Sequence, residues 1–342
     1  MNLSNWLRIP VGAIQLATHA KAFAGNPVIG SRRLNELGLH TTRRRFAARM
    51  AAYRRRQLAR HIAPAELAHF DSMGFFIRHE ALPEAHFQAL RAEVMALRTQ
   101  GWEMRQGKAV TRRVSLDSHV LRGNRACGQL VRDAGLRALI AYAASSRGDI
   151  TCQIQSVIVD NSCSVLDPQT QLHSDTFHAT AKAWLFLHDV DTDDGPFSYV
   201  PGSHKLTPAR LNWEYQQSLT ARESPEQMHR EGSFRINEGE LAQLDLPSPV
   251  RFTVPANTLV VADTSGFHAR TESRRPSHRV EIYGSLRRNP FVPWCGLHAF
   301  SLPFVSGHHT ALDIKLRQAS RSGANGDWQA FDDLNAYDLA RI

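Results

Sequence analysis

The sequence predicts a mainly β protein with flanking helices. From about residue 150 onward, short β-rich runs are separated by Asp, Gly, Pro and Asn, which are residues that favour turns. These runs do not alternate with long helical segments, so their spacing favours an antiparallel sandwich or barrel over a parallel sheet. Before residue 100, apolar residues recur instead at helical spacing. Helices are therefore expected beside a β core.

A basic, partly helical arm is expected over residues 1–61. Residues 1–60 hold eleven arginines and Lys21 against a single acid, Glu36, whereas the remaining 282 residues carry 29 basic and 31 acidic side chains. The net charge of +9 therefore belongs to the arm. Such a segment is compatible with an anionic membrane surface, with phosphates of a nucleic acid or an acyl-CoA, or with simple packing on the β core.

The helix of this arm is expected to run from Arg43 to about His61, with Thr41 and Thr42 as candidate caps. Three residues at positions i, i+4 and i+7 form an apolar face: Phe46, Met50 and Tyr53. We expect this face to pack on the rest of the protein. Two runs of three arginines supply the opposite face, which we expect to be solvated.

A second domain is expected over residues 62–342. It begins with a helix from Pro64 that Gly74 ends, a strand over 75–82, and a helix from Pro83 to Arg98. The β-rich runs then follow at 151–160, 181–190, 197–202, 250–254, 258–264 and 279–286. One stretch, about 206–232, is expected to be a helical insertion.

Composition excludes several classes of protein. With 42% hydrophobic and 21% charged residues, the chain is typical of a globular protein. The cysteines form no C-x-x-C pair, which argues against a disulfide framework or a zinc ribbon and suits a reducing compartment: Cys127, Cys152, Cys163 and Cys295. No apolar run approaches the ~18 residues that span a bilayer, and no secretion signal is apparent. A cytoplasmic location is expected, with membrane association through residues 41–60 as an alternative.

The first candidate for chemistry is the H-x-D triplet in QLHSDTFH. His173 and Asp175 are one residue apart, so on an extended segment both side chains point to the same side and can bind one metal ion. His268, directly after the run TLVVADT, is a candidate third ligand. Two histidines and one carboxylate leave three positions open on a six-coordinate ion, which is the arrangement of non-haem iron(II) oxygenases.

A candidate carboxylate-binding residue follows at a fixed distance. Arg279 lies eleven residues after His268, at the start of the run RVEIYGSL. An arginine on such a strand can enter the barrel and bind a carboxylate through two hydrogen bonds. Together with the metal ligands, it predicts a keto-acid co-substrate that chelates the metal at one end and pairs with the arginine at the other.

The residues just described resemble the phytanoyl-CoA dioxygenase family of iron(II)/2-oxoglutarate-dependent oxygenases. The matching pieces are QLHSD, AWLFLHDVDTDDGPFSYVPGSHK, and FHAR with Arg279 eleven positions after its histidine. The upstream segment IAPAELAHFDSMGFFIRHEALPEAHFQALRAEV is similar to the family's entry helix, strand and helix. The resemblance covers roughly residues 62–305.

This resemblance implies a double-stranded β-helix (jelly-roll, cupin-like) core. It implies that His173, Asp175 and His268 hold Fe(II) and that Arg279 binds the C5 carboxylate of 2-oxoglutarate. Arg270 and Arg275 are rivals for that role, but neither begins a strand. The resemblance also places Gln155 near the co-substrate, whereas Trp184 is either a pocket residue or a core tryptophan. Pro201, Gly202, Ser203 and His204 are expected to be structural.

Three classes of function are compatible with these features. The first is an Fe(II)/2-oxoglutarate dioxygenase that uses O₂ to hydroxylate an unactivated C–H bond of a small-molecule or lipid-type substrate; the intact Asp175 favours hydroxylation over the halogenation carried out by relatives that lack this carboxylate. The second is a catalytically silent binding protein of the same fold. The third is a peripheral membrane or nucleic-acid-binding protein that acts through the arm, although nucleic acid is not favoured. Substrate-pocket residues are expected from loops at 100–125 and 206–245, and the oligomeric state is left open.

Overall fold

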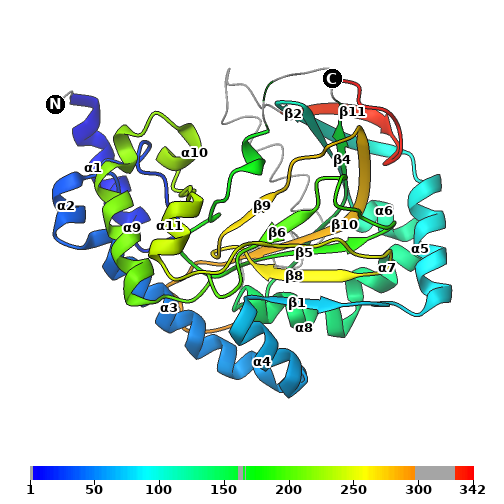
Figure 1. The fold of residues 1–342 in the computed structure, drawn as a ribbon, viewed down its shortest axis with the longest axis horizontal. Helices are drawn as coiled ribbons and strands as arrows, with labels where there is room; N and C mark the ends of the chain where they lie inside the picture. The colour runs from blue at the N-terminus through cyan, green and yellow to red at the C-terminus, as the bar shows by residue number, and fades with distance from the viewer. Residues whose placement is uncertain (1–2, 161–164, 166, 297–327) are drawn as a thin grey trace.

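The fold was analysed in a computed structural model, which describes residues 3–160, 165, 167–296 and 328–342. Cys163 and the last part of the 62–305 resemblance lie outside the described residues. Within these ranges the strands form two antiparallel sheets (Figure 1). This jelly-roll architecture with flanking helices confirms the fold class that the sequence predicts.

The larger sheet supplies the floor of the site. In spatial order its eight strands are β1 (Phe75–Arg78), β8 (Leu259–Asp263), β5 (Thr180–Phe186), β10 (Ser277–Arg287), β4 (Thr151–Val159), β3 (Ala109–Ser115), β2 (Thr99–Gln106) and β11 (Gln329–Leu334). β10 is its longest member and pairs with β5 on one side and β4 on the other. The register places Glu281 opposite both Gln155 and Phe186.

The smaller sheet faces the larger one. It contains β7 (Val250–Arg251), β6 (Phe197–Tyr199) and β9 (His268–Arg270). Phe197 of β6 packs on Trp184 of β5, with 4.2 Å between the ring centroids, so the two sheets are joined by an aromatic layer.

Alternation along the strands assigns one face of the large sheet to the site and the other to the core. On β5, Trp184 and Phe186 point toward the small sheet, whereas Ala183 and Leu185 join the main hydrophobic cluster on the opposite face. Successive side chains of a strand point to opposite faces, so one sequence run serves both purposes.

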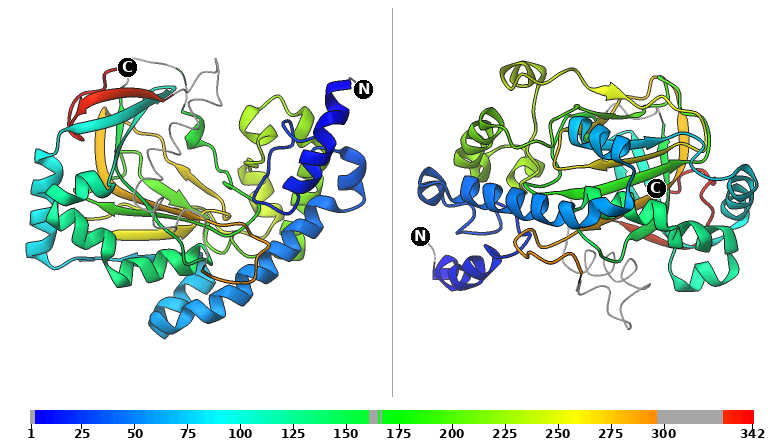
Figure 2. Two further views of the ribbon diagram at one scale, coloured as in Figure 1. Left: turned by 180° about the vertical axis from the view of Figure 1, so that it is seen from behind. Right: turned by 90° about the horizontal axis from the view of Figure 1, so that it is seen from below.

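Helices cover the outer face of the large sheet and one end of the molecule (Figures 1 and 2). The outer face is covered by α4 (Pro64–Met73), α5 (Glu84–Ala96), α6 (Ser118–Gly123), α7 (Arg125–Arg132) and α8 (Ala134–Ala143). The helices at the end are α1 (Leu3–Gln15), α2 (Arg32–Glu36), α3 (Leu39–Leu58), α9 (Pro208–Thr220), α10 (Gln227–Arg230) and α11 (Glu238–Gln243). Short 3₁₀ turns lie at Ala59–His61, Pro168–Thr170 and Ala221–Glu223.

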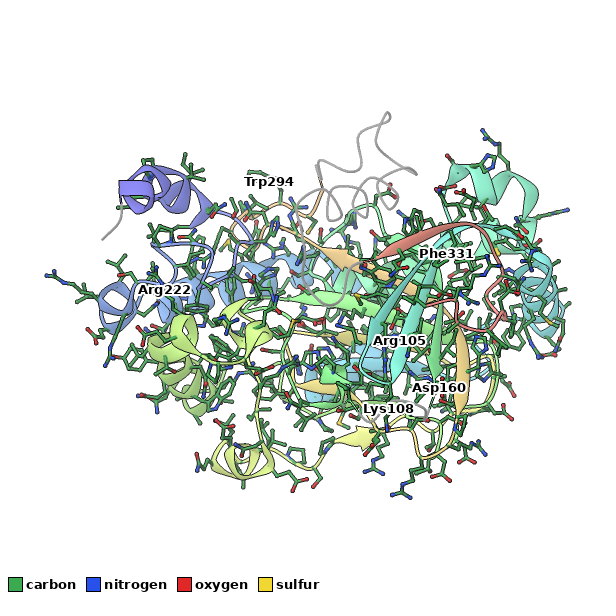
Figure 3. The ribbon with its side chains drawn as sticks, turned by 90° about the horizontal axis from the view of Figure 1, so that it is seen from above. Arg105, Lys108, Asp160, Arg222, Trp294 and Phe331 are labelled. Carbon is green, nitrogen blue, oxygen red and sulfur yellow. The ribbon has the colours of Figure 1, made fainter. Side chains whose placement is uncertain are left out.

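Several predicted elements are confirmed. The helix from Pro64 ends at Gly74, whose φ of 91° lies in the left-handed region that glycine adopts without strain. The insertion over about 206–232 is helical, because it contains α9 and α10. The segment 100–125, expected to be a loop, is mostly the β2–β3 hairpin and α6. Figure 3 shows Lys108 at the hairpin turn near Asp160 at the end of β4, and the amide of Asp160 donates to the Lys108 carbonyl at 3.2 Å.

The orientation predicted for the basic helix is wrong. α3 begins at Leu39 after Gly38, so neither threonine is its cap. Its buried face carries Arg43, Arg44 and Arg54, whereas Phe46 and Tyr53 are each 44% exposed. The physical reason is that Ala47 and Ala51 let the helix approach closely, and the arginine stems pack while their guanidinium groups reach buried acceptors.

The buried arginines of α3 fasten the N-terminal segment to the rest of the protein. Arg44 and Arg210 both donate to Glu214, at 3.2 and 2.8 Å, and His40 lies 3.1 Å from the same carboxylate. Arg54 donates to the Ser145 carbonyl at 2.6 Å. Figure 3 also shows Arg222, which follows α9, beside these N-terminal helices. Ion pairs as well as apolar contacts therefore hold the N-terminal segment against the rest of the protein.

Two further predictions concern the chain as a whole. Among the described residues, no helix is long and apolar enough to cross a membrane. Cys127, Cys152 and Cys295 are buried free thiols.

Candidate metal centre

Backbone pairing brings the three predicted metal ligands together. His173 and His268 form an isolated antiparallel bridge, in which each amide donates to the other carbonyl at 3.0 and 2.9 Å. The Asp175 amide donates to the Thr264 carbonyl at 2.9 Å, which fixes the third residue beside them. One ligand atom from each side chain lies within 4.8 Å of the others.

The two imidazole rings are oriented for metal binding. Nδ1 of His173 lies 2.8 Å from the Gln171 carbonyl, and Nδ1 of His268 lies 3.0 Å from the Gly266 carbonyl. A carbonyl only accepts, so each Nδ1 carries the proton and each Nε2 keeps its lone pair. These Nε2 atoms lie 3.8 and 3.6 Å from Oδ1 of Asp175. Nε2 of His268 is buried and has no hydrogen-bond partner among the described residues.

The carboxylate is held ionised by a neighbouring ammonium group. Burial alone would raise the pKa of Asp175, but the Lys182 ammonium outweighs this effect and holds the pKa well below its usual range. Nζ of Lys182 lies 2.7 Å from Oδ2 of Asp175. Burial, helped by His268, lowers the pKa of His173, so its ring is neutral and able to bind a metal. Lys182 therefore engages Oδ2 and leaves Oδ1 directed at the histidines.

This donor set fits a mononuclear metal ion. Two imidazole nitrogens and one carboxylate oxygen, with no thiolate, suit a divalent transition metal and leave coordination positions open for other ligands. The carbonyl acceptors behind both imidazoles are the outer contacts that metal-binding histidines require. The fold and this site define a jelly-roll protein with a two-histidine, one-carboxylate metal centre.

A cavity of about 510 Å³ extends from the metal centre between the two sheets. All six residues predicted for the site line it: His173, Asp175, His268, Arg279, Gln155 and Trp184. Both predicted substrate segments contribute, through residues such as Met104 of β2 and Met228 of α10.

Arg279 lies in this cavity with its charge largely desolvated. It is 5% exposed, and burial lowers its pKa despite the nearby Glu281. One Nη1 hydrogen bond goes to the Gly195 carbonyl, while Nε is buried without a partner among the described residues. A buried guanidinium with spare donors is suited to a carboxylate ligand.

The rival arginines are already engaged by acids. Arg270 lines the cavity, but its Nη1 lies 2.8 Å from Asp167. Arg275 is exposed and pairs with Asp194 at 2.8 Å. Neither offers the spare buried donors that Arg279 has.

Gln155 and Trp184 each have a partner within the protein. Nε2 of Gln155 donates to Oε1 of Glu281 at 2.7 Å. Trp184 belongs to the aromatic layer between the sheets and also lines the cavity. It is therefore both a core tryptophan and a residue of the pocket.

The P-G-S-H segment supports the turn before His268. Gly202 has φ 75°, and Oγ of Ser203 accepts from the Phe267 amide at 2.8 Å. His204 packs on Phe70, 5.6 Å between ring centroids, and burial lowers its pKa to about 3. These contacts are structural, as expected.

Five charged cavity residues were not predicted: Lys21, Arg113, Lys182, Glu226 and Glu281. Strand alternation could have indicated two of them, because Lys182 is in phase with Trp184 and Glu281 is in phase with Arg279. No local sequence pattern places Lys21 in the cavity. Its position follows from the loop between α1 and α2, which brings it to Asp175, 154 residues away in the sequence.

The sequence profile of the phytanoyl-CoA dioxygenase (PhyH) family matches residues 70–243, just over half of the chain. The chain belongs to this family. None of the curated protein sequences that were compared matches it.

Solved structures of similar fold were also compared. The carbocyclase SnoK from nogalamycin biosynthesis, described as non-haem and α-ketoglutarate dependent, is 17% identical; the match covers 67% of this chain and 84% of that one, with a TM-score of 0.40. HygX from Streptomyces hygroscopicus, solved with nickel, 2-oxoglutarate and hygromycin B, is 15% identical, with 66% and 86% covered and a TM-score of 0.39. The epimerase SnoN is 18% identical, with 65% and 81% covered and a TM-score of 0.43.

Proposed function

We propose that this protein is an Fe(II)/2-oxoglutarate-dependent dioxygenase that hydroxylates an unactivated C–H bond of a small-molecule substrate and releases succinate and CO₂. The observation that carries this proposal is the metal centre of His173, Asp175 and His268 in the same cavity as the buried Arg279. Membership of the family supports it.

Separate cavity residues are proposed to hold the metal and the co-substrate. His173, Asp175 and His268 would hold Fe(II), and Arg279 would bind the C5 carboxylate of 2-oxoglutarate. When bound, the metal and the keto acid supply the activation of O₂ and the oxidising power. Gln155, tied to Glu281, would border the co-substrate, and Trp184 would form part of the substrate wall.

The protein's own residues orient these groups and exclude water. The carbonyls of Gln171 and Gly266 fix the imidazole tautomers, so both lone pairs stay directed at one point. Lys182 fixes the carboxylate of Asp175 through Oδ2. The aromatic layer closes one side of the cavity, which shields the reacting atoms from bulk solvent.

Replacing Arg279 with Met is expected to raise the Kd of 2-oxoglutarate about 100-fold, because a desolvated, charge-assisted pair of hydrogen bonds is lost. Calorimetric titration of the metal-loaded protein measures this directly. Arg275→Met is the matched control, since that side chain is exposed and should leave the Kd unchanged. Equal affinity in the Arg279 variant and the wild type would remove Arg279 from the co-substrate site.

A succinate-release screen would identify the substrate. The protein is supplied with Fe(II), 2-oxoglutarate and a metabolite library, and hits are analysed by mass spectrometry with ¹⁸O₂. Hydroxylation adds one labelled oxygen atom to the product. A product without added oxygen would favour another oxidation, and the absence of any succinate would favour the silent binding protein.

A further inference from the structure

Glu281 lines the catalytic cavity from β10. Arg279, Glu281 and Tyr283 all line the cavity, whereas Val280 and Ile282, which alternate with them in the sequence, join the main hydrophobic cluster on the other face of the sheet. Successive side chains of a strand point to opposite faces, so the Glu281 side chain is directed to the cavity side. The proposed function assigns no ligand to it.

One oxygen of the Glu281 carboxylate has a partner and the other has none. Oε1 accepts a hydrogen bond from Nε2 of Gln155 at 2.7 Å, and the two residues lie opposite each other in the β4–β10 pair. Oε2 is buried and has no hydrogen-bond partner in the part of the chain that the structure describes. The whole residue is 1% exposed. Because Gln155 holds Oε1, the carboxylate is oriented while Oε2 keeps its capacity to accept.

The other two acids that line the described part of the cavity are paired with cations. Oδ2 of Asp175 lies 2.7 Å from Nζ of Lys182, and Oε1 of Glu226 lies 2.8 Å from Nε of Arg235. Glu281 forms no such ion pair with any described residue, and its contact with the Gln155 amide is neutral on the partner's side. It is therefore the acid of this cavity whose charge the protein leaves uncompensated.

A buried carboxylate oxygen without a donor is unfavourable for the folded protein. Folding removes its water and supplies no hydrogen bond in exchange, whereas a glutamine or an apolar side chain could occupy the same position without that cost. Nε2 of His268 and Nε of Arg279 are also buried in this cavity without a partner among the described residues. The proposed function assigns the first to the metal and the second residue to 2-oxoglutarate. By the same reasoning, Oε2 of Glu281 calls for a ligand from outside the chain.

We propose that Oε2 of Glu281 accepts a hydrogen bond from a hydroxyl or ammonium group of the main substrate. A carboxylate oxygen only accepts, so the group that it binds must be a donor. This inference rests on the proposed function, because the metal and 2-oxoglutarate are assigned to other residues and Glu281 remains for the molecule that is oxidised. Glu281 is thereby a specificity residue, since its charge-assisted hydrogen bond favours substrates that carry a donor at this place.

The test uses three small probes that share a benzene ring: benzyl alcohol, benzylamine and anisole. The ring suits the aromatic side chains of the cavity, such as Trp184, Phe186 and Phe197. Anisole is an isomer of benzyl alcohol whose oxygen can only accept. Each probe is titrated by calorimetry into the full-length protein loaded with Fe(II) and 2-oxoglutarate without O₂. We expect at least one donor probe to bind about tenfold more tightly than anisole, as one hydrogen bond to a charged group provides. The tighter of the two donor probes identifies the group as hydroxyl or ammonium.

Glu281→Gln assigns this preference to the residue. The substitution keeps the shape of the side chain and one oxygen that can accept from Gln155, but it replaces the free acceptor with a donor. It should abolish the preference for the donor probes without lowering Tm. Glu272→Gln is the matched control, because Glu272 is a 60% exposed glutamate that pairs with Lys108 and does not line this cavity. It should keep the preference.

Three results would overturn the role of Glu281. The first is a wild type that binds anisole as tightly as both donor probes. The second is a donor preference that persists in Glu281→Gln. The third is a lower Tm of Glu281→Gln together with loss of all three probes, which would show that Glu281 serves the fold.

The same samples separate this inference from the proposed function. Fe(II) and 2-oxoglutarate together give a visible charge-transfer band, which both the wild type and Glu281→Gln should show. A band in the wild type without a donor preference refutes the role of Glu281 alone. Absence of the band in the wild type refutes the proposed function, and the role of Glu281 with it.

Discussion

Replacing Asp175 with Ala is expected to reduce succinate release to the level of a metal-free blank. The variant loses the only carboxylate of the proposed ligand set and leaves Lys182, whose Nζ lies 2.7 Å from Oδ2, directed at the metal position. Two imidazoles would then face a metal ion with an ammonium group beside it, so both charge and geometry oppose binding. Fe(II) content after dialysis and succinate formation are the two measurements.

The control for this variant is Asp160→Ala, which removes an exposed carboxylate at the far end of β4 (Figure 3). Its metal content and turnover should match the wild type. Thermal unfolding of both variants establishes that the loss is not a loss of fold. Undiminished succinate formation by the Asp175 variant would exclude this residue from the ligands.

Glu214→Gln is expected to lower the free energy of unfolding by about 3–5 kcal/mol, because removing one partner of a buried ionic network leaves the other charges uncompensated. Glu214 is 2% exposed and accepts hydrogen bonds from Arg44 and Arg210. Burial would raise its pKa, but these two guanidinium groups hold the pKa far below its usual range. Urea unfolding followed by circular dichroism measures the change.

The matched control is Glu36→Gln. Glu36 forms an exposed pair with Arg32 at 3.0 Å, and such pairs contribute about 0–1 kcal/mol. A similar, small effect of both substitutions would show that the N-terminal segment is not fastened through Glu214. A large effect of Glu214→Gln alone would explain why this segment packs as part of the protein.

Local sequence patterns were sufficient to predict a mainly β protein with flanking helices and to identify three residues that could share one metal ion. The spacing of His173 and Asp175 places both side chains on one side of an extended segment, and the structure shows them beside His268. Strand alternation also places Arg279 on the cavity face, and Gln155, which the family resemblance placed near the co-substrate, lines the same cavity. These features depend on period and spacing, which a single sequence displays. The roles in binding 2-oxoglutarate stay predictions.

Contacts between distant residues account for what the sequence did not predict. A helical period assigns arginine to solvent, yet Arg44 is buried because it meets Glu214, 170 residues away. Lys21 reaches the cavity through a contact with Asp175, 154 residues away. No local pattern indicates either partner. The buried face of α3 and the place of Lys21 in the cavity could therefore be identified only from the three-dimensional structure.

The most direct test of the proposed metal and co-substrate site is an anaerobic titration of the protein with Fe(II) followed by 2-oxoglutarate. The result predicted is one Fe(II) per chain and a charge-transfer band that saturates at one 2-oxoglutarate per iron in the wild type. The same band should be absent in Asp175→Ala. Binding of 2-oxoglutarate that is independent of Fe(II), or a band that persists in Asp175→Ala, would contradict the assignment of His173, Asp175 and His268 as the iron site.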